Sequence, residues 1–236
     1  MKYLLNYANL RYYEFQSLST KQAYENGFDF VYQMKESDID EIFKEKNKSI
    51  FYQFKGAGYW IWKPYLILKV LKELKDNDYL LYLDSGACVN NSIEPLIDTL
   101  KNSKQDILCF GLNFKEKMYT KRDTFINMNL DYEEYTNSNQ INAGIQLIKK
   151  TEFSVKFYEE YLNWVLYDNN VTDSESKNSN YPEFIEHRHD QSIFSLLCKK
   201  YKFEVFRDPS QWGNVDISKY NNSPYGQIIV HHRNPK

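Results

Sequence analysis

Short apolar runs alternate with helical repeats along the first half of the chain. Short apolar-rich stretches predict strands at residues 2–8, 28–34, 79–83 and 106–112, and the run at 79–83, apolar at nearly every position, is typical of a strand covered on both faces. Between them, apolar residues recur every three or four positions, which predicts helices. In the clearest case a helix follows Pro64, because proline is favoured in a first helical turn and four apolar residues behind it share one face: Ile67, Val70, Leu71 and Leu74.

Polar residues mark where the other early helices are expected to start. Serine is a favoured N-cap residue, so we expect helices after Ser19, Ser37 and Ser92, with Gly27 ending the first of them. Strands that alternate with helices predict an α/β fold with a mixed, mostly parallel sheet flanked by helices. In such sheets, ligands bind beyond the carboxyl ends of the strands.

The second half of the chain is less regular. Residues 140–150 predict a strand with a central glycine, and residues 203–206 and 227–230 predict two short late strands. Helices are expected at residues 151–166 and 190–201. The polar stretch 168–183 between them predicts a mobile loop, which is a candidate lid over a ligand.

Charge, cysteine content and hydropathy exclude several classes of protein. The net charge is −2 and the pI is about 6.1, so no general basic field exists for nucleic acid. Three scattered cysteines argue against a disulfide framework or a zinc knuckle and favour a reducing compartment. No apolar run approaches the roughly 20 residues of a membrane helix, and the start is too polar for a signal peptide. We therefore expect a cytoplasmic protein, at most peripheral to the inner face of the membrane.

The stretch KGAGYWIWKP, residues 55–64, is the first candidate for a ligand site. Its glycines permit a close backbone approach, Trp60 offers a stacking face, and Lys63 lies just before the helix at Pro64. Backbone N–H groups and the helix dipole favour an anion there. The alternative is a turn with buried tryptophans, and the spacing alone does not decide.

A carboxylate at the end of a buried strand is the second candidate. In LYLDSGA, residues 81–87, the strand ends on Asp84, and the chain turns through Ser85 and Gly86. Such an aspartate can bind a divalent cation or a ribose hydroxyl. The alternative is a structural turn, for which Asp-x-Gly is favourable.

Two further clusters lie in the second half. In INAGIQLI, Asn142 precedes Ala143 and Gly144 within an otherwise regular strand, which indicates either a close ligand approach or an edge bulge. In HRHDQSIFSLL, Asp190 and Gln191 either face a pocket or, for Asp190, cap the helix.

The end of the chain, VHHRNPK, carries the last candidates. His231 and His232 follow a short apolar strand, with Arg233 and Lys236 close behind. Two histidines and two cations predict a metal or diphosphate cluster. A single histidine in this position would more often be structural.

Taken in order, these motifs resemble the GT-A fold glycosyltransferases, which use nucleotide sugars. GYWIWKPYLI followed by YLLYLDSG is similar to bacterial surface-polysaccharide sugar transferases. INAGIQLI, then HDQS, then a late strand ending in histidine, is similar to the retaining family eight transferases. The resemblance covers residues 1–236 in order and implies a Rossmann-related single domain, with a nucleotide-binding half (1–112) and an acceptor and donor-sugar half (113–236).

The resemblance also implies roles for the candidate residues. Catalytic roles would fall to Asp190 and Gln191 and metal binding to Asp84, His231 and His232, while the donor would contact Asp84, Ser85, Lys63, Trp60, Asn142, Ala143, Gly144 and Lys236. The implied cofactor is Mn²⁺ or Mg²⁺. Gly86 departs from the family, because it replaces the second acid of the Asp-x-Asp motif. Metal-independent stabilisation of the leaving group is the alternative, by Lys63, Arg188, Arg233 or Lys236.

The resemblance implies transfer of a sugar from a nucleotide sugar, of the UDP-hexose class, to a glycan or lipid-linked saccharide. Whether transfer inverts or retains the anomeric configuration stays open. A non-catalytic glycan- or nucleotide-sugar-binding protein on a degenerate transferase fold is the alternative, which Gly86 favours. A sugar nucleotidyltransferase ranks lower, because the first strand is not followed by a glycine- and basic-rich loop.

Overall fold

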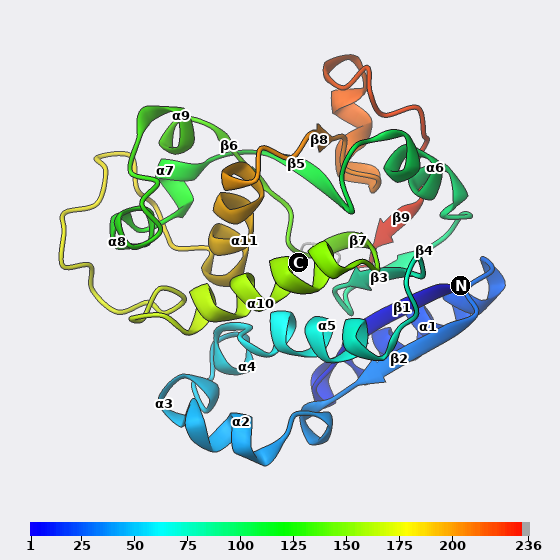
Figure 1. Ribbon diagram of the computed structural model, residues 1–236, viewed down its shortest axis with the longest axis horizontal. Coiled ribbons are helices and arrows are strands. Elements are labelled where there is room, and N and C mark those ends of the chain that lie inside the picture. Colours follow the sequence, from blue (N-terminus) through cyan, green and yellow to red (C-terminus); the bar gives the residue numbers. More distant parts are fainter. Residues whose placement is uncertain (233–236) are drawn as a thin grey trace.

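The computed structural model describes residues 1–232 (Figure 1). The strands are β1 (Lys2–Tyr7), β2 (Phe30–Met34), β3 (Tyr79–Leu83), β4 (Ala87–Val89), β5 (Ile107–Lys115), β6 (Asn139–Ile141), β7 (Ile145–Lys149), β8 (Val205–Phe206) and β9 (Ile229–His231). The helices are α1 (Tyr13–Glu25), α2 (Glu41–Lys46), α3 (Lys48–Phe51), α4 (Gly56–Tyr59), α5 (Trp62–Glu73), α6 (Glu94–Asn102), α7 (Glu116–Tyr119), α8 (Arg122–Asn127), α9 (Glu133–Thr136), α10 (Glu152–Leu166) and α11 (His189–Lys200). Short 3₁₀ turns are η1 (Leu10–Tyr12), η2 (Glu36–Asp38) and η3 (Gln211–Lys219).

The central sheet is mixed and mostly parallel, which confirms the predicted fold class. Its order is β2-β1-β3-β7-β5-β6, with β8 added beside β5. Strand β1 is parallel to β2 and β3, and β8 is parallel to β5. Because β7 is antiparallel to both β3 and β5, those two strands point the same way. The ends of β3 and β5 therefore meet at one edge of the sheet, where a ligand is expected.

Each face of the sheet carries its own apolar core, because successive strand residues point to opposite faces. Leu80 and Tyr82 of β3 pack on α5, α10 and α11, whereas Leu81 and Leu83 pack on the side of α1 and α6. Figure 1 shows α5, α10 and α11 crossing one face of the sheet. The continuous apolar run at residues 79–83 therefore marks a strand buried on both faces, as predicted, whereas β2 at the sheet edge is partly exposed.

The structure corrects several local predictions. Ser19 lies inside α1, which begins six residues earlier, and η2 contains Ser37 while α2 starts after Asp40. These serines lack the capping role because upstream residues already adopt helical geometry. Residues 140–150 form two strands, β6 and β7, rather than one, since the chain leaves the sheet at residues 142–144.

The segment between α10 and α11 has no regular secondary structure among its described residues, as its composition predicts. Its first part is nevertheless packed, because Asn170 and Val171 are fully buried. The Nζ of Lys121 donates to the carbonyls of Asn169 (2.7 Å) and Thr172 (3.1 Å). The later part is tied as well, because the backbone N–H groups of Lys177 and Asn178 donate to the carboxylate of Asp123 (2.6 Å and 3.0 Å).

Within residues 1–232, the helices are all too short or too polar to cross a membrane. The boundary predicted between the two halves, near residue 112, falls inside β5. One continuous strand therefore joins the two halves.

Candidate active site

Three chain segments meet at the carboxyl edge of β3. Asp84 follows the strand directly, residues 142–144 connect β6 to β7, and Asp190 lies in the first turn of α11. The backbone N–H of Asp84 donates to the carbonyl of Gly144 (2.9 Å), which ties the first two segments together. Asp84 is partly open to solvent, with 39% of its side chain exposed. The structure thus brings together most of the residues that the sequence predicted.

Lys63 is the cation that links these segments. It lies in the first turn of α5, and only 3% of its side chain is exposed. Its Nζ is 2.7 Å from Asp190 Oδ2 and 3.4 Å from Asp84 Oδ1, and it donates to the Ala143 carbonyl (3.3 Å). A buried ammonium needs such partners, because an unpaired buried charge is costly. Lys63 therefore fixes Asp84 and Asp190 relative to each other.

Two tyrosines complete the environment of the carboxylates. Tyr82 Oη donates to Asp84 Oδ1 (2.6 Å), and Tyr161 Oη donates to the Asp190 carbonyl (3.0 Å) and to Asp190 Oδ2 (3.3 Å). Burial raises the pKa of both phenols well above the usual value, so both stay protonated donors at neutral pH.

Burial also perturbs the charged groups at the centre of the site. Desolvation raises the pKa of Asp190, and the opposing attraction of Lys63 does not fully offset it. For Lys63, burial lowers the pKa, but Asp190 and Asp84 more than compensate, so its pKa lies above the usual value. The site thus holds a charged lysine beside a carboxyl group that retains a proton more readily than an exposed aspartate. Such perturbation is typical of functional sites.

The loop from Asn142 to Gly144 is held by its own polar groups. Asn142 Nδ2 donates to Asp208 Oδ2 (3.0 Å), and Asn142 Oδ1 accepts from the Gly144 N–H (2.7 Å). A side chain at position 144 would place Cβ 2.9 Å from Asp84 Oδ2. Glycine therefore permits the close approach to Asp84. The segment is a connection between β6 and the interior strand β7 rather than a bulge in an edge strand, and it lies at the site.

Gln191 lies beside this loop. Its Oε1 is 3.5 Å from the Ala143 nitrogen, and its Nε2 donates to Gln140 Oε1 (2.9 Å). Asp190 is the second residue of α11, and the N-cap position belongs to Arg188. The interpretation of Asp190 as a simple helix cap is therefore wrong: its carboxylate pairs with Lys63 instead.

Trp60 belongs to a strained turn next to the site. The α4 segment and Trp60 have positive φ from 49° at Ala57 to 90° at Gly58, so this stretch is left-handed. Left-handed geometry costs roughly 1–2 kcal/mol for each non-glycine residue. The turn places the Trp60 ring against His189 at 5.3 Å between centroids. Trp60 thus packs on the residue before Asp190, and its carbonyl accepts a hydrogen bond from the backbone N–H of Lys63 (2.9 Å).

Of the remaining predicted residues, Ser85 and Arg188 lie in the described part of the chain, and Arg233 and Lys236 do not. Ser85 is buried behind Asp84. Arg188 pairs with Glu186 (3.1 Å) and lies over the rings of Phe114 and Tyr119. The predictions for Arg233 and Lys236 lie outside the described residues.

Asp84 and His232, two of the residues predicted to bind a metal ion, already have other partners. Asp84 Oδ1 already accepts from Tyr82 and faces Lys63, and Gly86 offers no side chain. His232 contacts the thiol of Cys88, while the backbone of His231 pairs with Ala87. Within residues 1–232, no group of three or more His, Cys, Asp or Glu side chains is arranged so that it could hold a metal ion. The side chains of Asp84, His231 and His232 therefore do not form a divalent-metal site by themselves.

Four residues of the site were not predicted from the sequence: Tyr82, Gln140, Tyr161 and Asp208. Tyr82 could have been found, because residues two apart at a strand end point to the same side, and Tyr82 lies two residues before Asp84. Tyr161, Asp208 and Gln140 contact site residues only through tertiary structure. No local pattern in the sequence distinguishes these three from other polar residues.

Comparisons with known proteins support the same architecture. No protein-family model matches the chain, and no curated protein matches it. Among solved structures, it resembles a glycosyltransferase involved in glycosylation of the major capsid of PBCV-1, at 13% identity and a TM-score of 0.51, covering 99% of this chain and 94% of that one.

Two more solved structures agree with the first. An active-site mutant of LgtC gives 16% identity and a TM-score of 0.54 over 100% of this chain and 88% of its own. Mouse xyloside xylosyltransferase 1 shares 14% sequence identity with this chain, with a TM-score of 0.50, over 98% of this chain and 97% of its own. At identities this low, the structural similarity establishes the fold and leaves the substrates open. With its mixed sheet, its Asp84 strand end and these structural neighbours, the chain has the GT-A fold of glycosyltransferases.

Proposed function

We propose that the protein is a glycosyltransferase that moves a sugar from a nucleotide-sugar donor, of the UDP-hexose class, to a glycan or lipid-linked saccharide. The observation that carries the proposal is the buried Lys63, which joins Asp84 and Asp190 at the carboxyl edge of β3. Structural ion pairs also occur in cores, but this one lies at the ligand-binding edge of a GT-A fold. Polysaccharide biosynthesis is the process in which such an activity would act.

In this proposal, each segment has a distinct task. Asp84 and Ser85 contact the donor ribose, and residues 142–144 contact the donor sugar through backbone groups and Asn142. Asp190 and Gln191 face the reacting carbon. If transfer inverts the configuration, the carboxylate of Asp190 takes the acceptor proton as a general base. If transfer retains it, Asp190 and Gln191 line the reacting face of an oxocarbenium-like transition state.

The departing nucleoside diphosphate requires preorganised positive charge. Lys63 supplies one fixed ammonium, although two carboxylates already share it. Arg233 and Lys236 are the further candidates that the sequence offers. Since the described side chains do not make a metal site, we assign no step to Mn²⁺ or Mg²⁺. A nucleotide-binding first half and a sugar-binding second half complete the proposal.

The second candidate is a non-catalytic binding protein on the same fold. Gly86 favours it, because the residue removes an acid that would otherwise face the donor. This candidate binds a glycan or a nucleotide sugar without turnover, so donor hydrolysis separates it from the transferase.

A thermal-shift panel of UDP, GDP and CMP, each with and without Mn²⁺, tests the nucleotide binding that the transferase requires. A nucleotide at about a thousand times its dissociation constant should stabilise the fold by roughly 4 kcal/mol. We expect a shift with UDP that is reduced in Asp84→Ala. The absence of a shift with every nucleotide would contradict the proposal. An equal shift in Asp84→Ala would refute the placement of the donor.

A further inference from the structure

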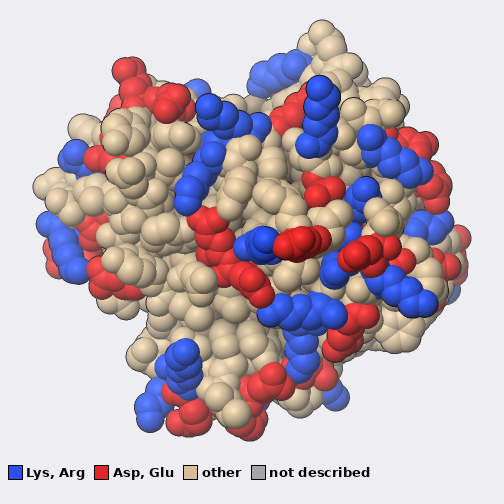
Figure 2. Space-filling model, viewed as in Figure 1, with Lys and Arg blue, Asp and Glu red and all other residues tan. Residues whose placement is uncertain are grey.

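Glu116 is fully buried, although its side chain is a carboxylate. It is the first residue of α7 and directly follows β5. On the face of the molecule that Figure 2 shows, Lys and Arg are instead interspersed with Asp and Glu at the surface. A carboxylate removed from water needs several hydrogen-bond donors, because the loss of its hydration is otherwise costly. The partners of Glu116 therefore show what its burial achieves.

Helix α11 presents a polar stripe to Glu116. Ser192, Ser195 and Lys199 are three and four residues apart, so they share one side of the helix. Both serines are fully buried, and only 13% of the Lys199 side chain is exposed. The Oγ of Ser195 and the Nζ of Lys199 (2.5 Å) both donate to Glu116 Oε1. The stripe is thus one half of a buried hydrogen-bond network, which Glu116 completes.

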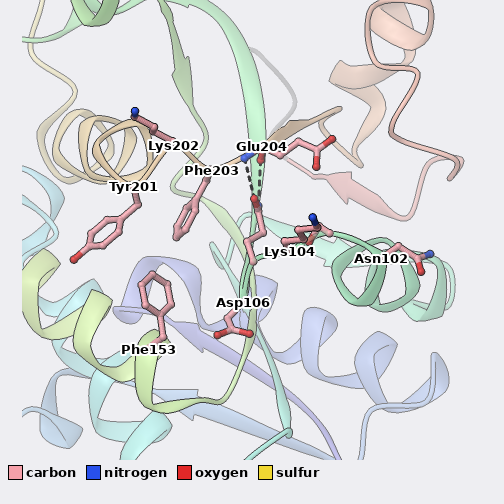
Figure 3. A pocket seen from close by; sticks show the side chains of 10 residues that line it. Asn102, Lys104, Asp106, Phe153, Tyr201, Lys202, Phe203 and Glu204 are labelled. Carbon is pink, nitrogen blue, oxygen red and sulfur yellow. Dashed lines mark hydrogen bonds between the residues drawn. The ribbon is translucent and has the colours of Figure 1, made fainter.

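The C-terminal end of α11 is held by aromatic rings, which fixes the position of this stripe. Figure 3 shows Phe153, Tyr201 and Phe203 around a cavity of about 600 Å³ at that end. The Phe153 ring packs on Tyr201 and on Phe203, with 5.4 Å and 6.0 Å between centroids. Packed aromatic pairs stabilise such an arrangement beyond the area that they bury. The network therefore rests on an anchored helix.

The second carboxylate oxygen of Glu116 orients the amide of Gln140. Glu116 Oε2 accepts from Thr120 Oγ1 (2.7 Å) and from Gln140 Nε2 (3.2 Å). Three more oxygens surround Gln140 Nε2: Thr120 Oγ1 at 3.2 Å, Ser192 Oγ at 3.3 Å and the Tyr119 carbonyl at 3.4 Å. Thr120 donates its own proton to Glu116. Ser192 donates its proton to the Tyr119 carbonyl (2.8 Å). All four oxygens therefore act as acceptors toward Gln140.

The direction of the Gln140 amide fixes that of Gln191. A reversed Gln140 amide would place its oxygen against four acceptors, which would leave buried groups unsatisfied. Gln140 Oε1 therefore faces Gln191, whose Nε2 donates to it (2.9 Å). The amide oxygen of Gln191 is then left for the opposite side, where it is 3.5 Å from the Ala143 nitrogen. We name the series Glu116–Gln140–Gln191 the amide relay.

The direction of the Gln191 amide matters for the proposed reaction. Gln191 is partly exposed, follows Asp190 and lies beside the loop 142–144. An oxocarbenium-like transition state carries positive charge. An amide oxygen has a partial negative charge that stabilises it, whereas an amide NH₂ group opposes it. A reversed Gln191 would therefore raise the barrier without changing the shape of the site.

We propose that Glu116 is a positioning residue, which acts through Gln140 to hold the amide oxygen of Gln191 toward the reaction centre. The orientation follows from the hydrogen bonds themselves, whereas its effect on turnover rests on the proposed function. Lys199 neutralises the buried carboxylate. Since apolar residues of similar volume are often at least as stable as a buried ion pair, stability alone does not account for this arrangement.

Two variants interrupt the amide relay at different points. Glu116→Gln replaces the carboxylate by a group that donates as well as accepts. Gln140→Met removes the link but keeps the Glu116–Lys199 ion pair, so it tests the relay even if Glu116→Gln does not fold. We expect both to lower kcat for nucleotide release from a hexose conjugate at least about tenfold. Nucleotide binding in the thermal-shift assay should stay within a factor of about three.

Phe194→Leu is the matched control for a loss of stability. Phe194 is fully buried on α11, and its truncation weakens the packing of the same helix while the amide relay keeps its hydrogen bonds. Its kcat should stay close to that of the natural protein at a melting temperature lowered as in the relay variants.

NMR contacts of the Gln140 amide protons measure the orientation independently of turnover. In the natural protein, we expect these protons to lie close to the side chains of Thr120 and Ser192. The contacts should weaken in Glu116→Gln, because the carboxylate that selects this orientation is gone.

Two results would overturn the inference. The first is a natural protein in which the Gln140 amide protons face Gln191 instead. The second is a kcat that falls no further in Glu116→Gln and Gln140→Met than in Phe194→Leu, because the network would then be structural only. If the natural protein releases no nucleotide from any donor, the proposed function fails, and the NMR contacts alone decide whether Glu116 orients the two amides.

Discussion

Replacing Lys63 by methionine should destabilise the protein in a pH-dependent way. The substitution keeps much of the side-chain volume but removes the ammonium that is 2.7 Å from Asp190 Oδ2. Asp190 is then left as a buried carboxylate without its cation, in a place where only 5% of its side chain is exposed. Removal of one partner from a buried ion pair typically costs 3–5 kcal/mol. Against a total stability of roughly 5–15 kcal/mol, that is a large fraction.

The cost should depend on pH because Asp190 can take up a proton. Desolvation already raises its pKa, and losing Lys63 would raise it further. An acid whose folded pKa lies above its unfolded value, about 3.9, favours the folded state at low pH. That advantage is lost as pH rises through the folded pKa. The deficit of Lys63→Met should therefore be small near pH 4 and grow toward pH 8, by at most about 1.4 kcal/mol per pH unit.

Chemical denaturation at pH 5 and pH 8 would measure this deficit, with Asp190→Asn and the double variant as controls. The double variant removes both charges, so it should be more stable than the sum of the two single losses predicts. A deficit that is equal at both pH values would refute the account of the Lys63–Asp190 pair. So would strictly additive effects in the double-mutant cycle.

Three other changes test particular contacts. Gly144→Ala should destabilise the protein by roughly 1–3 kcal/mol, because the new Cβ would be too close to Asp84 Oδ2. It should also reduce donor binding in the thermal-shift assay. Normal donor binding would count against this contact. In the left-handed turn, Ala57→Gly should stabilise the protein by about 1 kcal/mol. Gly58→Ala should destabilise it, because the new Cβ would be 2.6 Å from the Phe51 carbonyl oxygen. The opposite order of the two denaturation midpoints would disprove that geometry. Burial lowers the pKa of His187 and of His189, so as pH falls the unfolded chain takes up protons before the folded one. The free energy of unfolding should therefore fall as pH drops below about 6.5. A free energy of unfolding that stays constant from pH 7 to 5 would contradict their neutral, buried state.

The periodicity of the sequence predicted the layers of the fold because both depend on the same alternation. Strand β3 is buried on both faces, and the apolar run from residue 79 to 83 shows this directly. The same reasoning placed Asp84 at the ligand-binding edge. Helix starts were predicted less well: α1 begins at Tyr13 without a side-chain cap, so the pattern around Ser19 carried no information about it.

The composition of the site was predictable only in part. Asp84 follows a predicted strand, Asn142 lies within one, Asp190 lies at the start of a predicted helix, and the fold brings these three segments together. The role of Lys63 was not predictable, because its burial depends on how α5 packs against the edge of the sheet. Tyr161 and Asp208 lie far from their partners in sequence, and their contacts exist only in the folded chain.

The central claim is that Asp84, Lys63 and Asp190 form the reaction centre of a nucleotide-sugar transferase. Its most direct test is the release of UDP, GDP or CMP from a panel of their hexose conjugates by the natural protein and by Asp190→Asn. We expect release from one class of donor, and a loss of roughly 10²–10⁴-fold in Asp190→Asn while the nucleotide still binds. Release at the same rate in Asp190→Asn, or no release from any donor, would contradict the claim.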